Sequence, residues 1–237
     1  MTARTALIVR GGWDGHQPVR ATEVFLPFLE AQGYHIRIEE SPEIYADAEA
    51  MASTDLIVQS VTMSSITHEQ VNGLRAAVAS GTGLTGWHGG IADSYRASSD
   101  YLQLVGGQFA THPSRQPELL VEGAHENNYL PHTIEITDLG RAHPITAGID
   151  DFALTTEQYW VLHDDLNDVL ATTTHPTQPW HPWHRPITSP AVWTRLWGQG
   201  RIVVTTPGHT PDILEHASVR TIIERGMLWA TRTASAS

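Results

Sequence analysis

The chain has 237 residues, 41% of them hydrophobic, and a formal net charge of −12. That length fits one large α/β domain with a sizeable core, and the acidic charge argues against binding to nucleic acid or to an anionic membrane surface. The sequence contains no cysteine, which excludes disulfides, thiolate metal ligands and a thiol nucleophile. We expect a cytoplasmic protein, because the N-terminus has no signal-peptide pattern and no apolar run approaches the roughly 20 residues of a membrane span.

The first 90 residues alternate between strand and helix patterns. The predicted strands are residues 6–9, 34–38, 55–61 and the run that ends at Trp87. Apolar residues at helical spacing predict a helix over 21–29, and Pro27 should kink or interrupt it. Thr67 and Gln70 have the spacing of a capping box, which opens a second helix that ends at Gly81. This alternation predicts a parallel sheet with helices on both faces.

The last of these strands runs into a tight glycine turn. Gly86-x-His88-x-Gly90 has the spacing of a nucleophile elbow, a sharp strand-to-helix turn that exposes one side chain above a sheet. Here the exposed residue is a histidine, which can act as a base, a metal ligand or a hydrogen-bond donor. Because ligands bind beyond the carboxyl ends of parallel strands, we expect the loops after three strands to share one edge of the sheet. These loops are residues 11–16, 61–65 and 87–93.

The second half of the chain mixes short strands with turns. Residues 94–105 fit a helix, and the strands expected after it are 119–122, 132–137, 154–160 and 168–174. A loop rich in Pro, Trp and His spans 175–190. One interpretation is an aromatic lid that packs on a sugar. The other is a metal site at His181 and His184, which their spacing indicates only weakly. A hairpin, 191–197 with 201–206, and a helix over 219–230 complete the elements. We expect one domain over 1–237, with a frayed tail from Thr231.

Histidine and tryptophan are frequent, with 14 and 8 residues, and together they indicate a polar small-molecule site with aromatic walls. His16 and His209 each follow a strand, and the period of two places Glu157 and Tyr159 on the same face of a strand. For each residue, an ordinary surface or core position is the alternative. The candidates are His88, Glu157, Tyr159 and His209 for catalysis, and Trp13, His16, Trp87 and His112 for substrate binding.

Several stretches, taken in order, resemble the trehalose-utilisation (ThuA-like) family over nearly the whole chain. They are the glycine-rich turn with His16, Gly81-x-Gly83 leading to Gly86-Trp87-His88, Leu104-Val105-Gly106-Gly107-Gln108-Phe109 with His112-Pro113, His143-Pro144-Ile145-Thr146, Glu157-x-Tyr159, and Trp197-Gly198-x-Gly200-Arg201 with Gly208-His209. The resemblance implies a three-layer, flavodoxin-like fold similar to class I glutamine amidotransferases, with a mostly parallel sheet, antiparallel additions and His88 in place of the amidotransferase cysteine. The family often has a small residue such as Ser after this histidine and an Asp before the glutamate, whereas this chain has Gly89 and Thr156.

The resemblance also implies a role in the utilisation of disaccharides or oxidised sugars. One hypothesis is an enzyme, such as a hydrolase or isomerase, that modifies a small sugar or ketosugar through acid–base chemistry; without a thiol it is not a glutaminase. Converging histidines could also hold a divalent metal such as Zn²⁺. The alternatives are a non-catalytic sugar-binding or regulatory protein and an interaction scaffold. We expect a sugar as the ligand, no nucleic acid and no membrane, and the sequence leaves a homo-oligomer open.

Overall fold

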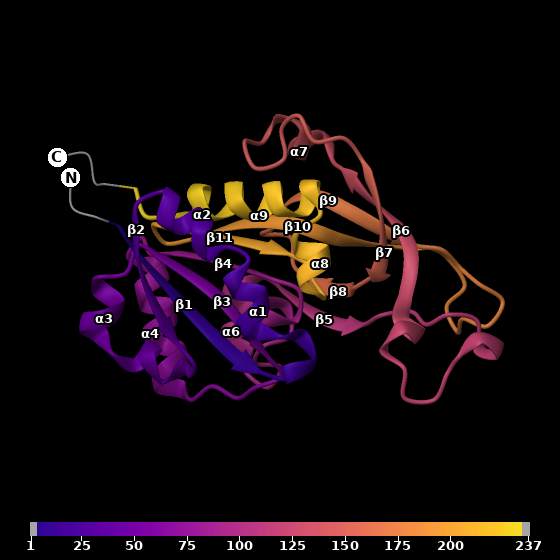
Figure 1. Ribbon diagram of the computed structural model, residues 1–237, viewed down its shortest axis with the longest axis horizontal. Coiled ribbons are helices and arrows are strands. Elements are labelled where there is room, and N and C mark those ends of the chain that lie inside the picture. The colour runs from indigo at the N-terminus through magenta and orange to yellow at the C-terminus, as the bar shows by residue number, and fades with distance from the viewer. Residues whose placement is uncertain (1–3, 234–237) are drawn as a thin grey trace.

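The computed structural model describes residues 4–233, and within that range a nine-stranded mixed sheet runs through the centre of the molecule (Figure 1). Its parallel half consists of β1 (Arg4–Gly12), β2 (Tyr34–Glu39), β3 (Leu56–Thr62), β4 (Gly83–Trp87) and β11 (Gly200–Thr205). These strands lie in the order β2-β1-β3-β4-β11. The inner strand β1 is buried on both faces, since it places Ala6 and Ile8 in one core and Leu7 and Val9 in the other. The predicted parallel sheet is confirmed.

Antiparallel strands extend this sheet beyond β11. They are β10 (Ile187–Trp197), β9 (Asp168–His175), β6 (Tyr129–Ile136) and β7 (Phe152–Glu157), in that order across the sheet. β10 and β11 form the predicted hairpin, in which Trp197 lies opposite Gly200. β5 (Gly107–Thr111) and β8 (Trp160–His163) pair separately as a two-stranded antiparallel ladder. The antiparallel additions expected from the sequence are therefore present.

Helices cover both faces of the sheet. One face carries α1 (Pro18–Glu23), α2 (Leu26–Ala31), α8 (Pro211–Leu214) and α9 (Ala217–Ala230), and the other carries α3 (Ala48–Ala52), α4 (His68–Ala79), α5 (Gly89–Ala92) and α6 (Ser99–Val105). The helix α7 (Asp138–Ala142) packs against β9, and the 3-10 turns are η1 (Asp14–His16), η2 (Pro42–Ala46), η3 (Pro117–Leu119) and η4 (His125–Asn128). This arrangement gives the three layers of the predicted flavodoxin-like fold.

Two predictions about helix ends are confirmed. The backbone N–H of Thr67 donates to Gln70 Oε1 at 2.8 Å, and the backbone N–H of Gln70 donates to Thr67 Oγ1 at 3.3 Å, which completes the capping box of α4. The helix predicted over 21–29 is interrupted, since α1 ends at Glu23 and Pro27 lies in the first turn of α2.

Several predicted boundaries in the second half are wrong. Residues 119–122 form no strand, because the Asn127 side chain binds both the N–H and the C=O of Val121, at 2.9 and 2.7 Å, and folds this segment onto itself. The strand predicted over 154–160 is divided into β7 and β8 at Gln158. The helix predicted from residue 94 begins at Ser99, where Ser98 Oγ accepts the Tyr101 N–H.

The loop predicted over 175–190 is shorter than expected. His175 lies opposite Ile187 in the ladder between β9 and β10, and residues 188–190 continue this pairing. The side chains at both ends of the predicted loop therefore belong to the sheet. The part outside the two strands is residues 176–186.

The end of the described chain is anchored rather than frayed at Thr231. Thr231 Oγ1 lies 2.6 Å from the Tyr34 hydroxyl, and Arg232 Nη2 donates to Thr82 Oγ1 at 2.6 Å. The predicted fraying is thus wrong for these residues, and 234–237 lie outside the described residues. Across residues 4–233, no helix has the length and apolar character needed to cross a bilayer.

Candidate functional site

The site is built on the turn after β4. His88 has a φ of 49° and a ψ of −139°, a left-handed backbone conformation that is strained for a residue with a side chain. Its backbone N–H donates to Thr205 O at 2.7 Å, and its carbonyl accepts the N–H of Ala92 at 2.9 Å. A Cβ at Gly90 would lie 2.8 Å from Ser60 Cα, so the turn requires glycine there. The chain therefore adopts the strained strand-to-helix turn that the spacing predicts.

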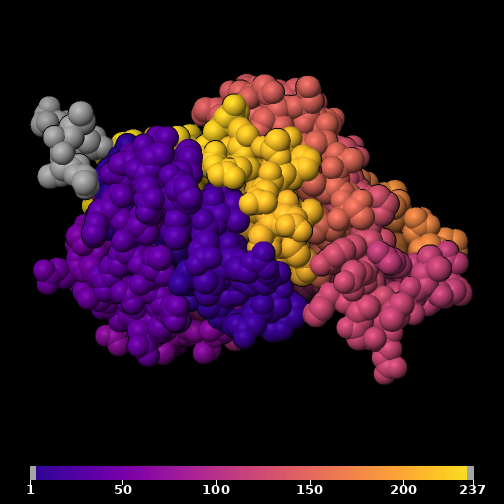
Figure 2. Space-filling view, viewed as in Figure 1, coloured from indigo at the N-terminus to yellow at the C-terminus, as the bar shows by residue number. Residues whose placement is uncertain are grey.

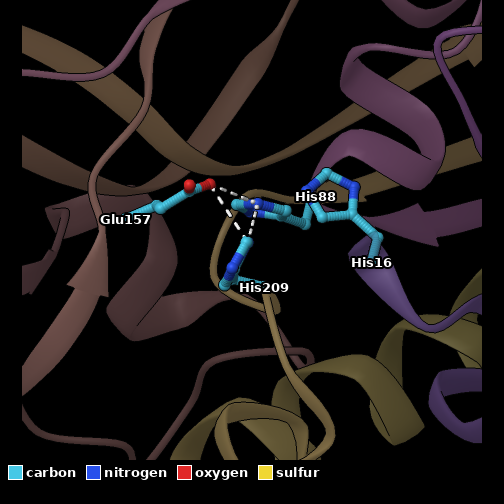
Figure 3. A group of neighbouring side chains, drawn as sticks. All are labelled: His16, His88, Glu157 and His209. Atoms are coloured by element: carbon cyan, nitrogen blue, oxygen red, sulfur yellow. Dashed lines mark hydrogen bonds and ion pairs between the residues drawn. The ribbon is translucent and has the colours of Figure 1, made fainter. Parts of the chain in front are cut away.

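Three ionisable side chains meet at this turn (Figure 3). His88 Nε2 lies 3.1 Å from Glu157 Oε2, His209 Nδ1 lies 3.1 Å from the same oxygen, and the two nitrogens are 3.2 Å apart. All three residues are buried. His16 joins them from η1, and one ligand atom from each of the four lies within 4.8 Å of the others. The edge of the sheet thus gathers side chains from the turn after β4, the end of β7, the loop after β11 and the turn after β1.

A backbone contact fixes the tautomer of His88. Its Nδ1 lies 2.8 Å from the carbonyl oxygen of Thr206, which can only accept a hydrogen bond, so Nδ1 carries the proton. In the neutral ring, the lone pair of Nε2 then faces Glu157 Oε2. A metal-binding histidine commonly donates its other N–H to a carbonyl in this way.

Burial controls the charge of these groups. Burial lowers the pKa of His88, although the hydrogen bond and the charge of Glu157 oppose this shift. Burial also lowers the pKa of His16 to about 2, and the neighbouring His88 and His209 add to the effect. For Glu157, burial alone would raise the pKa, but the His209 and His88 imidazoles hold the pKa of this carboxyl well below its usual range. At neutral pH the His16 and His88 imidazoles are therefore neutral, and Glu157 is a carboxylate.

This donor set fits a divalent metal ion. Ligands at Zn–N and Zn–O distances of about 2.0–2.1 Å, arranged as a tetrahedron, lie about 3.3 Å from one another. The His88, His209 and Glu157 atoms are 3.1–3.2 Å apart, close to that spacing. Two imidazoles and one carboxylate also form the ligand set of several catalytic zinc sites. The described residues therefore contain a cluster that could bind a metal, with His16 as the fourth member.

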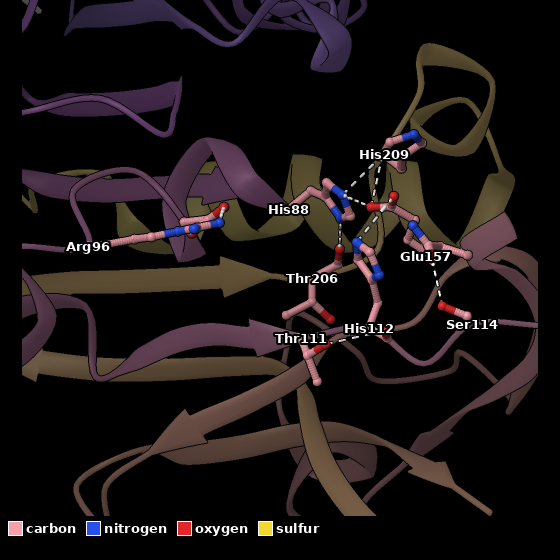
Figure 4. A network of polar contacts seen from close by, with 10 residues as sticks. His88, Arg96, Thr111, His112, Ser114, Glu157, Thr206 and His209 are labelled. Atoms are coloured by element: carbon pink, nitrogen blue, oxygen red, sulfur yellow. Dashed lines mark hydrogen bonds and ion pairs between the residues drawn. The ribbon is translucent and has the colours of Figure 1, made fainter. Parts of the chain in front are cut away.

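A cavity of about 170 Å³ opens beside the cluster. Five of the residues singled out in the sequence line it: Trp13, His16, His112, Glu157 and Tyr159. His112 Nε2 lies 3.5 Å from Glu157 Oε1, the carboxylate oxygen that the buried histidines do not use (Figure 4). The Tyr159 ring lies 4.1 Å from that of His88, and burial, together with Glu157 and Asp93, raises the pKa of Tyr159 well above its usual range. Tyr159 therefore presents a neutral phenol.

Trp87 is the exception among the predicted residues. Its side chain is 2% exposed, belongs to a hydrophobic core cluster and packs 4.9 Å from the Phe25 ring. Trp87 is the last residue of β4 and packs into the core on one face of the sheet, whereas His88 lies in the turn beyond the strand end. The structure therefore places the Trp87 ring in the core and not in the wall of the cavity.

The sequence-based reasoning missed several residues of the cavity wall. Asp93 is buried and binds Arg96 in a two-pronged ion pair, in which Nη2 and Oδ2 are 2.7 Å apart. Asp93 belongs to one of the three loops predicted at this edge, so a search for charged residues there would have found it. Phe109, which belongs to one of the stretches that resemble the family, also lines the cavity, as do His125 and Asn128, which no local pattern marked.

The family model described as "Trehalose utilisation", ThuA, matches residues 5–230. The chain belongs to the ThuA family. No curated protein matches the sequence.

Several solved structures share the fold of this chain. A ThuA-like protein from Bacteroides uniformis superposes with a TM-score of 0.71 at 16% identity, covering 97% of this chain and 93% of the other. One from Parabacteroides merdae gives the same TM-score and identity, with coverage of 99% and 93%. A Salmonella typhimurium protein described as cytoplasmic has a TM-score of 0.64 at 13% identity, with coverage of 96% and 100%. At these identities the likeness establishes the fold, which is the predicted ThuA-like one.

Proposed function

We propose that this ThuA-family chain is a carbohydrate-modifying enzyme that acts on a small sugar at the His88 cluster. The observation that carries the proposal is the convergence of His88, Glu157 and His209 to within 3.2 Å beside a cavity. Buried titratable groups of shifted pKa that line a cavity are typical of catalytic sites. The family description supports a sugar as the substrate. We include in the proposal a divalent ion, such as Zn²⁺, held by these three residues and His16.

The cavity offers a distinct role to each accessible group. His112 is 25% exposed and contacts Glu157 Oε1, so it can take a proton from a sugar hydroxyl or water while the carboxylate stabilises the resulting cation. The neutral phenol of Tyr159 can donate a hydrogen bond to a substrate oxygen. Trp13 supplies an aromatic wall that can pack on the apolar face of a sugar ring. A bound divalent ion would supply Lewis acidity toward a substrate oxygen.

Metal binding and turnover test the proposal separately. Protein purified without a histidine tag is titrated with Zn²⁺ by calorimetry, and a panel of disaccharides and 3-ketosugars is assayed for turnover. Glu157→Gln preserves shape but removes the charge of one ligand, so zinc affinity should fall by at least about 100-fold. His88→Ala should abolish both zinc binding and turnover. His35→Gln is the matched control, because His35 is exposed on the edge strand β2.

The outcomes distinguish the hypotheses. Wild-type protein that binds no divalent ion would contradict the metal part of the proposal, while turnover that depends on His88 would still support acid–base chemistry. Sugar binding without turnover of any panel member would favour the alternative, a non-catalytic binding or regulatory protein.

A further inference from the structure

A second cavity lies between the segment that follows β5 and the loop that joins β9 to β10. Its volume is about 250 Å³, and its wall includes Ser114, Arg115, Gln178, Trp180 and His181. Figure 2 shows that the segment between β5 and β6 projects from the body of the molecule. The loop contributes the Trp- and His-rich stretch of the sequence, which the His88 cluster does not use.

The two cavities share one wall. His112 and Asn128 line the cavity at the cluster, while Ser114, two residues after His112, lines the second (Figure 4). Ser114 Oγ donates a hydrogen bond to Asn128 Oδ1 at 3.2 Å, so one pair of side chains belongs to both walls. The two cavities are therefore neighbours along the chain segment from His112 to Ser114.

The second cavity has an aromatic face suited to a sugar ring. Trp180 is 38% exposed, which is high for so large an apolar side chain. Its indole can pack against the C–H groups of a sugar. Arg115 and Gln178 add polar groups at the same wall, and such groups fix the orientation of a ligand that apolar contact alone would leave free.

His181 lines the cavity with a ring that its neighbours hold in place. The Gln178 N–H donates to His181 Nδ1 at 3.2 Å, so in the neutral ring the proton lies on Nε2. This Nε2 is buried and has no hydrogen-bond partner within residues 4–233. The ring is held in place by stacking on Trp183, with centroids 4.0 Å apart. Because Nε2 is closed off from solvent, His181 shapes the cavity wall by contact and does not act as a donor to a ligand there.

We propose that the second cavity is a carbohydrate subsite, which holds the second ring of a disaccharide or glycoside whose first ring lies at the His88 cluster. The inference rests on the proposed function and specifies a substrate of at least two rings. Each cavity alone is smaller than the roughly 300 Å³ at which sites for small molecules usually begin. Together, the two cavities match a ligand that consists of two sugar rings.

Calorimetry with trehalose, maltose and cellobiose, each compared with glucose, tests this subsite. Wild-type protein should bind at least one disaccharide about tenfold or more tightly than glucose. Trp180→Ala should weaken binding of that disaccharide between about twofold and tenfold, while glucose affinity stays unchanged. Trp180→Phe, which keeps an aromatic face, should restore most of the affinity. Leu166→Ala is the control, because Leu166 is 73% exposed and lines neither cavity.

Three results would overturn the subsite: no measurable disaccharide binding, equal affinity for one ring and two, or an equal loss for both ligands in Trp180→Ala. Turnover is measured on the same proteins, so that the two proposals fail separately. A disaccharide preference that depends on Trp180, without turnover, overturns only the enzymatic proposal. Turnover with equal affinity for glucose and every disaccharide overturns only the subsite.

Discussion

His175 should make the stability of the fold sensitive to mild acid. Its ring is fully buried, with Nε2 donating to the backbone carbonyl of Tyr159 at 3.0 Å. Burial lowers the pKa of His175 to about 4, although the hydrogen bond to Tyr159 opposes the shift. In the unfolded chain the pKa returns to about 6.5. Between these values the unfolded chain binds a proton that the folded chain does not, so the free energy of unfolding falls as the pH falls.

The size of this effect follows from the two pKa values. Proton uptake integrated from pH 7 to pH 5 gives a loss of about 1.8 kcal/mol from His175 alone. Urea unfolding of wild type and His175→Gln at both pH values, with EDTA present throughout, measures it. The glutamine amide can still donate to Tyr159 but cannot take up a proton. The wild type should therefore lose about 1.8 kcal/mol more than the variant, and equal losses in the two proteins would refute the reasoning.

Two further substitutions test the role of His16 in metal binding and the role of His112 in turnover. In Gly89→Ala, the new Cβ would lie 2.5 Å from His16 Cε1 and 2.7 Å from Nδ1, so the ring must move and zinc affinity should fall by about tenfold or more in calorimetry. An unchanged affinity would show that His16 is not a ligand. His112→Asn removes the base next to Glu157 Oε1, so kcat on the best sugar substrate should fall by about 100-fold while zinc affinity stays within about twofold. Loss of zinc binding in this variant would instead place His112 among the ligands.

The centre of the site was predictable because it depends on local patterns. The glycine spacing around His88 predicts the turn, and the alternation of strands and helices predicts which loops meet at the same edge. The period of two also placed Glu157 and Tyr159 on one face and Gln158 on the other. The structure agrees, since Gln158 Nε2 donates to Thr173 Oγ1 at 2.7 Å, away from the cavity.

The parts that could not be predicted depend on contacts between distant segments. The pairing of β5 with β8 joins residues some fifty positions apart, and no turn signal links them. The segment around Val121 has an apolar run typical of a strand, but side-chain bonds from Asn127 decide its conformation. Trp87 illustrates the same limit, because composition suggested an aromatic wall whereas packing against Phe25 placed the ring in the core.

The cluster also links distant parts of the sequence into one cooperative unit. His88 is separated from Glu157 by 69 residues and from His209 by 121 residues. No continuous fragment of moderate length contains the ligand set, so an ion can be held only after the parallel and antiparallel halves of the sheet have joined. The binding of an ion at the cluster therefore depends on folding of the whole domain rather than of one local segment. At a concentration 100 times its dissociation constant, it would add about 2.7 kcal/mol to the free energy of unfolding of the whole domain.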